Sequence, residues 1–252
     1  MTEIGVAPRF DMGRVVNRTF GVISRNWQTL GGLALLLGTV PQGLVQSAQI
    51  MSQGSSGSPF GPLYWVNVVV SLLSSCLLQA AVIHGTFADL NGRRSSLGES
   101  LGTGLRFVLP VLGAGIVGGV CVALGIVLLI VPGVLIGLAW IVAIPVIVVE
   151  RTGVFGSFAR SAALTRNHRG SIFGLFVVYW LVLTVLAALV GVLTVGLGMT
   201  ASGGRSIAAV IPTAILSGVI GLVGATGIAS IYYELRNIKE GIGPDALASV
   251  FD

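Results

Sequence analysis

The chain has 252 residues, of which 54% are hydrophobic and only 9% are charged, and its mean hydropathy is +0.96. Soluble domains carry about 25% charged residues, so this composition excludes an ordinary soluble globule. The net charge is +5, but no basic domain stands apart from the apolar stretches, which argues against nucleic acid as a partner and favours an anionic membrane surface.

The charges are confined to particular parts of the chain. Of the 23 charged side chains, 22 fall in the segments 1–27, 89–106, 150–170 and 234–252. The connections that alternate with these segments, 52–62, 131–133 and 200–206, contain a single charge, Arg205. Loops rich in Lys and Arg face the cytoplasm, so this pattern predicts that both termini are cytoplasmic and that the number of membrane crossings is even.

Residues 1–27 are predicted to form an amphipathic interfacial segment. They are too long and too polar for the start of a cleavable signal peptide. Their apolar residues recur at helical spacing, with charged residues on the other face. The expected apolar face consists of Met12, Val15, Val16, Thr19, Phe20 and Ile23, and the expected polar face of Asp11, Arg14, Arg18 and Arg25.

Six apolar stretches follow, each close to the ~20 residues that cross a bilayer as a helix. We place them at about 28–51, 63–88, 107–131, 132–149, 171–199 and 207–233, with a cytoplasmic tail over 236–252. The third and fourth are separated only by a tight turn at Pro132, so a kinked re-entrant pair is an alternative to two crossings, although the length of the two stretches favours crossing. The prediction is an all-α, multi-pass membrane protein that forms one integral membrane domain.

Two further surface helices are expected before the third and fifth spans. Their apolar positions are Leu97, Leu101, Leu105 and Val108 in one, and Val154, Phe155, Phe158 and Ala162 in the other. This pattern predicts three repeated units, each made of a surface helix followed by a transmembrane hairpin. The alternative is that any hairpin protein with basic loops looks repetitive.

One stretch carries a resemblance to a known family. Residues 145–169, PVIVVERTGVFGSFARSAALTRNHR, followed by Ser-Ile-Phe-Gly, resemble the membrane domain of the glycerophosphoryl diester phosphodiesterase membrane-domain family and related bacterial inner-membrane proteins. Residues 20–37 and the ending YYELR with KEG are similar as well. The resemblance implies a multi-helix, lipid- or envelope-related module of a bacterial inner membrane. Some relatives continue into a soluble phosphodiesterase domain, but only 16 residues follow Arg236 here, so we expect no catalytic domain and carry over no catalytic residue.

Polar side chains share a face on each of the first two spans. The candidate stripe consists of Gln42, Gln46, Gln49, Asn67, Ser71, Ser75 and Gln79. Amides in hydrocarbon need hydrogen-bond partners, which a facing helix can supply. The stripe is therefore either hydrogen-bonding contact between helices or the lining of a polar cavity that opens toward the non-cytoplasmic side.

Small residues and basic residues form two more candidate sets. Gly115 and Gly119 in the third span, and Ser217, Gly221 and Ala225 in the last, favour close helix crossing within the chain or with a partner. Arg160, Arg166, His168 and Arg169 are candidates for contact with lipid phosphate from the cytoplasmic face. The alternative role for the basic set is to determine topology.

The sequence contains no catalytic motif of a hydrolase, kinase or metalloprotease and no metal-ligand or cofactor spacing. Cys76 and Cys121 both fall in predicted spans, where packing thiols are more common than a disulfide. We therefore expect a non-enzymatic membrane protein without a cofactor, acting as a lipid-associated envelope module or as an accessory subunit of a membrane complex. Its expected partners are membrane lipids or another membrane protein, with the oligomeric state open. The alternative is a small transporter or permease subunit with a polar path between the first two helices.

Overall fold

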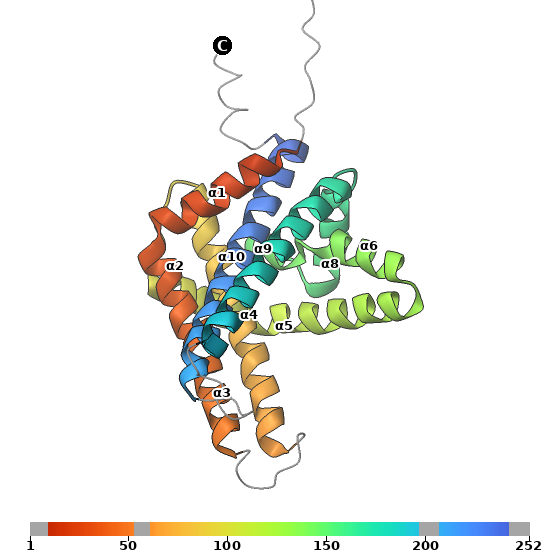
Figure 1. Cartoon of the computed structure of the whole chain (residues 1–252). Helices are drawn as coiled ribbons and strands as arrows, with labels where there is room; N and C mark the ends of the chain where they lie inside the picture. The colour runs from red at the N-terminus through yellow and green to blue at the C-terminus, as the bar shows by residue number, and fades with distance from the viewer. Residues whose placement is uncertain (1–9, 53–60, 197–206, 242–252) are drawn as a thin grey trace, which may run out of the picture.

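The protein is all-α in the computed structural model, which describes residues 10–52, 61–196 and 207–241 (Figure 1). Five helical stretches in these residues are long and apolar enough to cross a membrane: Tyr64–Leu90, Leu97–Leu128, Ile130–Glu150, Arg169–Gly196 and Ala208–Glu240. These agree with the predicted second to sixth spans. Arg205 and the tail beyond residue 241 lie outside the described residues.

The predicted surface helix at the start is α1, Met12–Arg25. The Asp11 side chain caps it by accepting a hydrogen bond from the backbone N–H of Arg14, as aspartate does at helix N-termini. The predicted apolar face is divided between the protein and the outside. Val15, Thr19 and Val22 are buried, whereas Phe20 is 57% exposed. The buried residues face α10 and α4, and the apolar residues beside them face outward.

The first predicted span is helical throughout but divided into three pieces. They are α2 (Trp27–Leu33), the π-helical segment η1 (Ala34–Thr39) and α3 (Val40–Ser52). Pro41 lacks a backbone N–H and its ring crowds the preceding turn, which is a common cause of such widening. The π-helical segment packs on α10, where the Cα of Gly218 would lie 2.9 Å from a Cβ added to Gly38. Only glycine permits that approach of two backbones.

Helix α4, Pro62–Leu90, runs back along this first helical stretch, and α5, Leu97–Leu128, follows it. The predicted second surface helix is not separate, because α5 is continuous from its N-cap Ser96 through residues 97–106 and beyond. Gly104 lets α5 cross closely over α4, since a Cβ there would lie 3.1 Å from the carbonyl oxygen of Leu77.

The fourth predicted span is broken into α6, Ile130–Trp140, and α7, Ala143–Glu150. Pro145 has no N–H to donate to the carbonyl four residues earlier, which explains a break at this point. Helix α8, Val154–Thr165, packs across the break. The hydroxyls of Ser161 and Thr165 donate to the carbonyl oxygen of Ala139 at 2.8 and 3.3 Å, so α8 satisfies a carbonyl near the interrupted end of α6.

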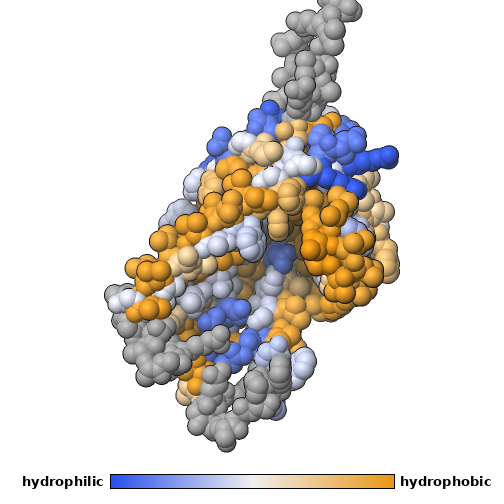
Figure 2. Space-filling model, turned by 45° about the vertical axis from the view of Figure 1, so that its right-hand side comes forward, coloured by the Kyte–Doolittle hydropathy of each residue, from blue (hydrophilic) through white to orange (hydrophobic). Residues whose placement is uncertain are grey.

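The last two helices are α9, Arg169–Gly196, and α10, Ile207–Glu240. Helix α10 contacts α1, η1, α3 and α4, whereas α9 is lightly packed and none of the residues in its most apolar window is buried. Most of the space-filled surface is hydrophobic, with hydrophilic residues gathered near α1 and in a hollow farther along the molecule (Figure 2). This distribution is the one expected when lipid covers the sides of the helices.

Candidate functional site

Charged side chains from distant segments meet at one end of the helices, which we call the charged end. Glu234 on α10 is 0% exposed, and both of its carboxylate oxygens are paired with arginines of α1. Arg14 Nη1 donates to Oε1 at 3.1 Å and Arg18 Nη1 donates to Oε2 at 2.8 Å. The guanidinium of Arg18 also lies 4.8 Å from the ring centroid of Tyr233. These contacts fasten the surface helix α1 to α10.

A second network fastens α8 to the same end. Arg160 Nε donates to Glu150 at 3.0 Å, and its Nη2 donates to Glu240. The Tyr232 hydroxyl donates to Glu150 Oε1 at 2.7 Å, and Arg236 Nε donates to Glu240 Oε2 at 2.8 Å. Arg160, predicted as a lipid-phosphate contact, is therefore engaged by two carboxylates of the protein.

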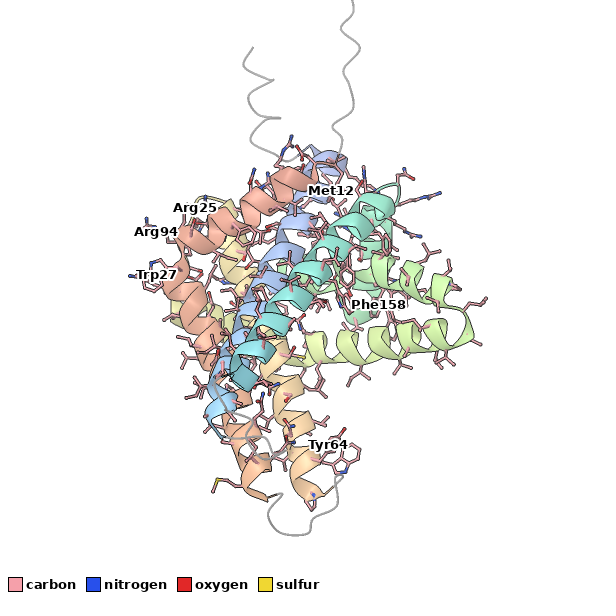
Figure 3. All side chains as sticks on the ribbon, in the orientation of Figure 1. Met12, Arg25, Trp27, Tyr64, Arg94 and Phe158 are labelled. Carbon is pink, nitrogen blue, oxygen red and sulfur yellow. The ribbon has the colours of Figure 1, made fainter. Side chains whose placement is uncertain are left out.

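Asp89 forms the third junction, between the end of α4 and the α1–α2 corner. It accepts hydrogen bonds from Arg25 Nη2 at 2.6 Å and from Asn26 Nδ2 at 2.5 Å. The hydrogen bond to Asp89 raises the pKa of Arg25, which keeps the guanidinium charged. Arg25 and Arg94 are labelled at this end of the molecule in Figure 3, with Tyr64 near the opposite end.

The carboxylates of Glu234, Glu150, Glu240 and Asp89 are thus engaged by side chains of the protein, and a set of arginines in the described part of the chain remains without such a partner. Within the described residues, six arginines have no carboxylate partner: Arg93, Arg94, Arg106, Arg151, Arg166 and Arg169. We call this set the basic rim. It includes two of the predicted phosphate contacts, both beside the turn between α8 and α9. An anion outside the protein can reach these guanidinium groups without competing with a carboxylate.

His168 lies in the turn between α8 and α9, with its ring centroid 6.0 Å from that of Phe10. Burial first, and then the charge of Lys239, lowers its pKa. The imidazole is therefore neutral at pH 7, and of the four predicted phosphate contacts Arg166 and Arg169 are the charged groups that remain available.

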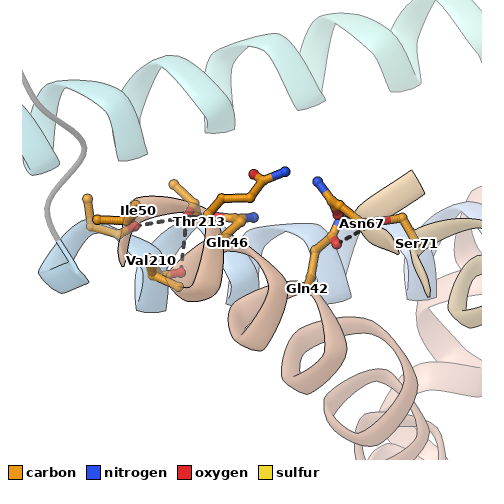
Figure 4. A pocket seen from close by; sticks show the side chains of 9 residues that line it. Gln42, Gln46, Ile50, Asn67, Ser71, Val210 and Thr213 are labelled. Carbon is orange, nitrogen blue, oxygen red and sulfur yellow. Dashed lines mark hydrogen bonds between the residues drawn. The ribbon is translucent and has the colours of Figure 1, made fainter. Parts of the chain in front are cut away.

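At the other end of the molecule, the predicted polar stripe lines a cavity of about 330 Å³ (Figure 4). Five of the seven stripe residues line this cavity, together with residues of α10. The lining residues are Gln42, Gln46, Gln49, Ile50, Asn67, Ser71, Ala209, Val210 and Thr213. The cavity therefore lies among α3, α4 and α10 rather than between the first two spans alone.

Hydroxyl groups hold the cavity amides in place. Ser71 Oγ lies 3.0 Å from Gln42 Oε1 and 3.0 Å from Asn67 Oδ1, and Thr213 Oγ1 lies 3.1 Å from Gln46 Oε1. Each hydroxyl has one proton to donate, so Ser71 can serve only one of its two amide oxygens at a time, and both amide NH2 groups and amide oxygens remain for a ligand. The lining thus suits an uncharged solute with hydrogen-bonding groups.

Thr213 is the lining residue that the sequence did not single out. It stands one turn after Ala209 on α10, and periodicity within the first two spans contains no signal for it. The remaining stripe residues, Ser75 and Gln79, lie farther along α4 and bond to each other, with Gln79 Nε2 donating to Ser75 Oγ at 3.0 Å.

The predicted packing residues fall into two groups. On α10, Ala225 is buried and Gly221 faces α4 so closely that a Cβ would lie 2.7 Å from Leu78 Cδ2; Ser217 on the same helix bonds back to the carbonyl of Thr213. On α5, a Cβ at Gly115 or Gly119 would meet nothing within 4 Å. These two glycines line an open apolar groove of about 190 Å³ between α5, α6 and α8, beside Trp140 and Phe158.

Comparison with known proteins adds no assignment, since no family model, no curated protein and no solved structure matches the chain. The geometry also offers no metal centre within the described residues, which contain no cluster of three or more His, Cys, Asp or Glu side chains. Cys76 and Cys121 are free thiols. The two features with chemical content are the basic rim and the polar cavity, at opposite ends of the molecule.

Proposed function

We propose that the protein is a non-enzymatic, lipid-associated module of a bacterial inner membrane, with its charged end and both termini on the cytoplasmic side. The basic rim carries this proposal. Its six arginines have no carboxylate partner, whereas the carboxylates of Glu234, Glu150, Glu240 and Asp89 are already paired, so most of the unpaired charge of the described residues is positive. Juxtamembrane arginines are attracted to anionic head groups by about 1 kcal/mol each near the surface.

The position of aromatic residues supports this orientation in a bilayer. Trp27, 65% exposed, lies beside the charged end, and Trp65, 60% exposed, stands at the start of α4 near the other end. Tryptophan is enriched at both membrane–water interfaces. The two residues thus mark the two levels that we assign to the head groups, with the apolar sides of the helices between them.

The same proposal includes an alternative role for the protein, as an accessory subunit of a membrane complex. Helix α9 supports it, because its most apolar window has no buried residue and its large side chains point outward. Such a helix is covered by lipid or by another membrane protein.

The experiment compares the lipid retained by the wild-type protein with that retained by a R166Q/R169Q variant. Both are purified in mild detergent from membranes containing phosphatidylglycerol and measured by native mass spectrometry. Arg205→Gln is the matched control, because the sequence assigns Arg205 to the opposite side. We expect anionic lipid to be lost in the double variant only. Equal retention in all three proteins contradicts lipid binding at the rim, and a protein that co-purifies in place of lipid favours the accessory subunit.

A second candidate function, solute binding in a small transporter or permease subunit, is favoured by the polar cavity. A hydrated cavity lets a thiol ionise and react, whereas hydrocarbon does not. We therefore expect Q46C and S71C, in a C76A/C121A background, to react with a membrane-impermeant methanethiosulfonate. Thr184→Cys on the outward side of α9 is the control, since it is exposed but faces lipid. Cavity cysteines that react no faster than this control exclude a water-filled path.

A further inference from the structure

The hairpin of α5 and α6 leaves the bundle sideways, and its turn lies level with the middle of α4 and α10 rather than with either of their ends (Figure 1). We propose that this hairpin is embedded in the membrane without crossing it, so that its turn is covered by lipid acyl chains. The proposal concerns topology and does not depend on head-group binding at the basic rim.

The composition of the hairpin is the first support. From residue 107 to residue 149 the chain has no charged residue and no Ser, Thr, Asn, Gln or His, and the turn itself reads IVLLIVPG. A turn that emerges into water normally contains polar residues or residues typical of turns, because its peptide groups and side chains are solvated. Here Pro132 and Gly133 alone have turn character, and every other residue of the turn is large and aliphatic.

The exposure of the turn is the second support. Val127 is 82% exposed, Leu128 79%, and Leu129, Ile130 and Val131 are 68–70% exposed. A segment that docks against a protein is amphipathic, with an apolar face toward the partner and a polar face toward water. This turn is apolar all round, which is the property of a segment surrounded by hydrocarbon.

The backbone of the turn keeps part of its helical hydrogen bonding. The N–H of Leu129 donates to Gly125 O at 3.0 Å, and the N–H of Gly133 donates to Leu129 O at 3.4 Å. Pro132 has no N–H that needs a partner. The interruption at the extended residue Leu129 leaves the N–H groups of Ile130 and Val131 as the free donors at the start of α6.

Length is the third support. Helix α6 has 11 residues, or about 16 Å at 1.5 Å per residue, roughly half of the ~30 Å hydrocarbon core. The break before α7 then turns the chain, and Glu150 at the end of α7 is held by Tyr232 at the charged end. Because both limbs return to the side from which they came, both termini remain on one side, as they do if the hairpin crosses twice.

Two glycines close the hairpin near its turn. A Cβ on Gly133 would lie 2.5 Å from the backbone nitrogen of Ile126, and one on Gly125 would lie 2.8 Å from the Cα of Gly133. The limbs therefore touch through their backbones, which makes a narrow wedge rather than two separated helices with lipid between them.

The test is the membrane depth of a nitroxide attached to Leu129→Cys in a C76A/C121A background, reconstituted in phosphatidylcholine–phosphatidylglycerol vesicles. Val127→Cys is a second site, chosen because its side chain has few contacts and its replacement spares the fold. Met51→Cys, at the exposed end of α3, is the control at the water-facing end. We expect both turn sites to collide with molecular oxygen and to lose contact with a water-soluble nickel complex, whereas Met51→Cys keeps that contact.

Two results overturn the proposal. One is nickel contact at Leu129→Cys and Val127→Cys equal to that at Met51→Cys, which places the turn in water. The other is spin–spin broadening or disulfide formation between turn cysteines of two copies, which means that a second copy covers the turn. Lipid loss from the R166Q/R169Q variant is unaffected by either result, so the two proposals fail independently.

Discussion

Replacement of Glu234 by Gln is expected to release α1 from the rest of the protein. The substitution keeps the size of the side chain and removes the charge that holds Arg14 and Arg18. The Arg18 pair is the stronger of the two, because Glu234 and Arg18 are only 1% and 20% exposed in their side chains. A hydrogen bond to a charged group in such a place contributes about 1.5–3 kcal/mol.

The Arg14 pair adds less, because the Arg14 side chain is 50% exposed and exposed ion pairs contribute about 0–1 kcal/mol. The sum is about 1.5–4 kcal/mol. Its middle corresponds to roughly a hundredfold rise in the population with α1 detached, since 1.4 kcal/mol is tenfold. Hydrogen exchange of the α1 amides in lipid nanodiscs measures this population. The expected result is about a hundredfold faster exchange in α1, with exchange in α5 unchanged.

A double-mutant cycle makes the reasoning refutable. If the Arg18–Glu234 contact is real, the R18Q/E234Q double variant loses less than the sum of the single losses, with a coupling of more than about 1 kcal/mol. Arg14→Gln is the internal comparison and should cost no more than about 1 kcal/mol. A coupling near zero, or unchanged exchange in Glu234→Gln, would show that apolar packing alone holds α1.

Three other predictions concern stability. Ser161→Ala should destabilise the protein by about 0.5–1.5 kcal/mol, because it removes the shorter of the two hydroxyl contacts to the carbonyl oxygen of Ala139. Ser157→Ala, equally buried but bonded only within its own helix, should cost less. Thermal unfolding in detergent that ranks the two variants alike refutes the idea that α8 supports the break. Gly218→Ala should destabilise the protein, because a Cβ there would lie 2.3 Å from the hydroxyl of Thr39 at the end of η1. Gly227→Ala, where nothing lies within 4 Å of the added Cβ, should be neutral or stabilising by about 0.5–1 kcal/mol. Thermal unfolding in detergent compares the two variants. The folded state lowers the pKa of His168 below its ordinary 6.5, so the unfolded state binds the proton more readily. The stability that His168 contributes is therefore retained above about pH 6.5 and lost as the pH falls below it. His168→Gln should flatten that part of the curve of stability against pH, and an unchanged curve assigns the effect to another group.

The positions of the long helices could be predicted from the sequence because their signal is local. Apolar length and the segregation of charge predict the second to sixth spans, although the third helix begins ten residues earlier, at Leu97, and the last ends seven residues later, at Glu240. Asp11 marks the start of α1. Caps and breakers act over a few residues, so the effect of Pro145 could also have been inferred. The sequence could not indicate that α8 would donate hydrogen bonds to the carbonyl oxygen of Ala139.

The face of α1 that packs inward could not be predicted, for a physical reason. Lipid is as apolar as a protein core, so apolar periodicity does not distinguish Val15 and Val22, which are buried, from Val16 and Phe20, which face outward. The same ambiguity explains why Gly115 was expected at a helix crossing and lies in an open groove. Only contacts with distant segments separate these cases.

The polar cavity was predictable in part. Gln42 and Ser71 belong to consecutive helices, and their proximity follows from the hairpin between them. Thr213 is 167 residues from Gln46, and its contribution depends on how α10 crosses α3. Arg160 is paired with Glu150 and Glu240, whereas Arg166 has no carboxylate partner within the described part of the chain. That difference likewise depends on the folded chain, because the two glutamates lie on other helices than Arg160 does.

The contact between α1 and α10 also bears on the order in which the protein is assembled. Glu234 is separated from Arg14 by 220 residues, so an arginine pair made early in synthesis has no counter-ion until α10 has been translated and inserted. During that interval α1 must rest on the membrane surface by itself, with Arg14 and Arg18 exposed to head groups and to proteases. We therefore expect α1 to be cleaved faster by limited proteolysis in chains that end before residue 234 than in the full chain.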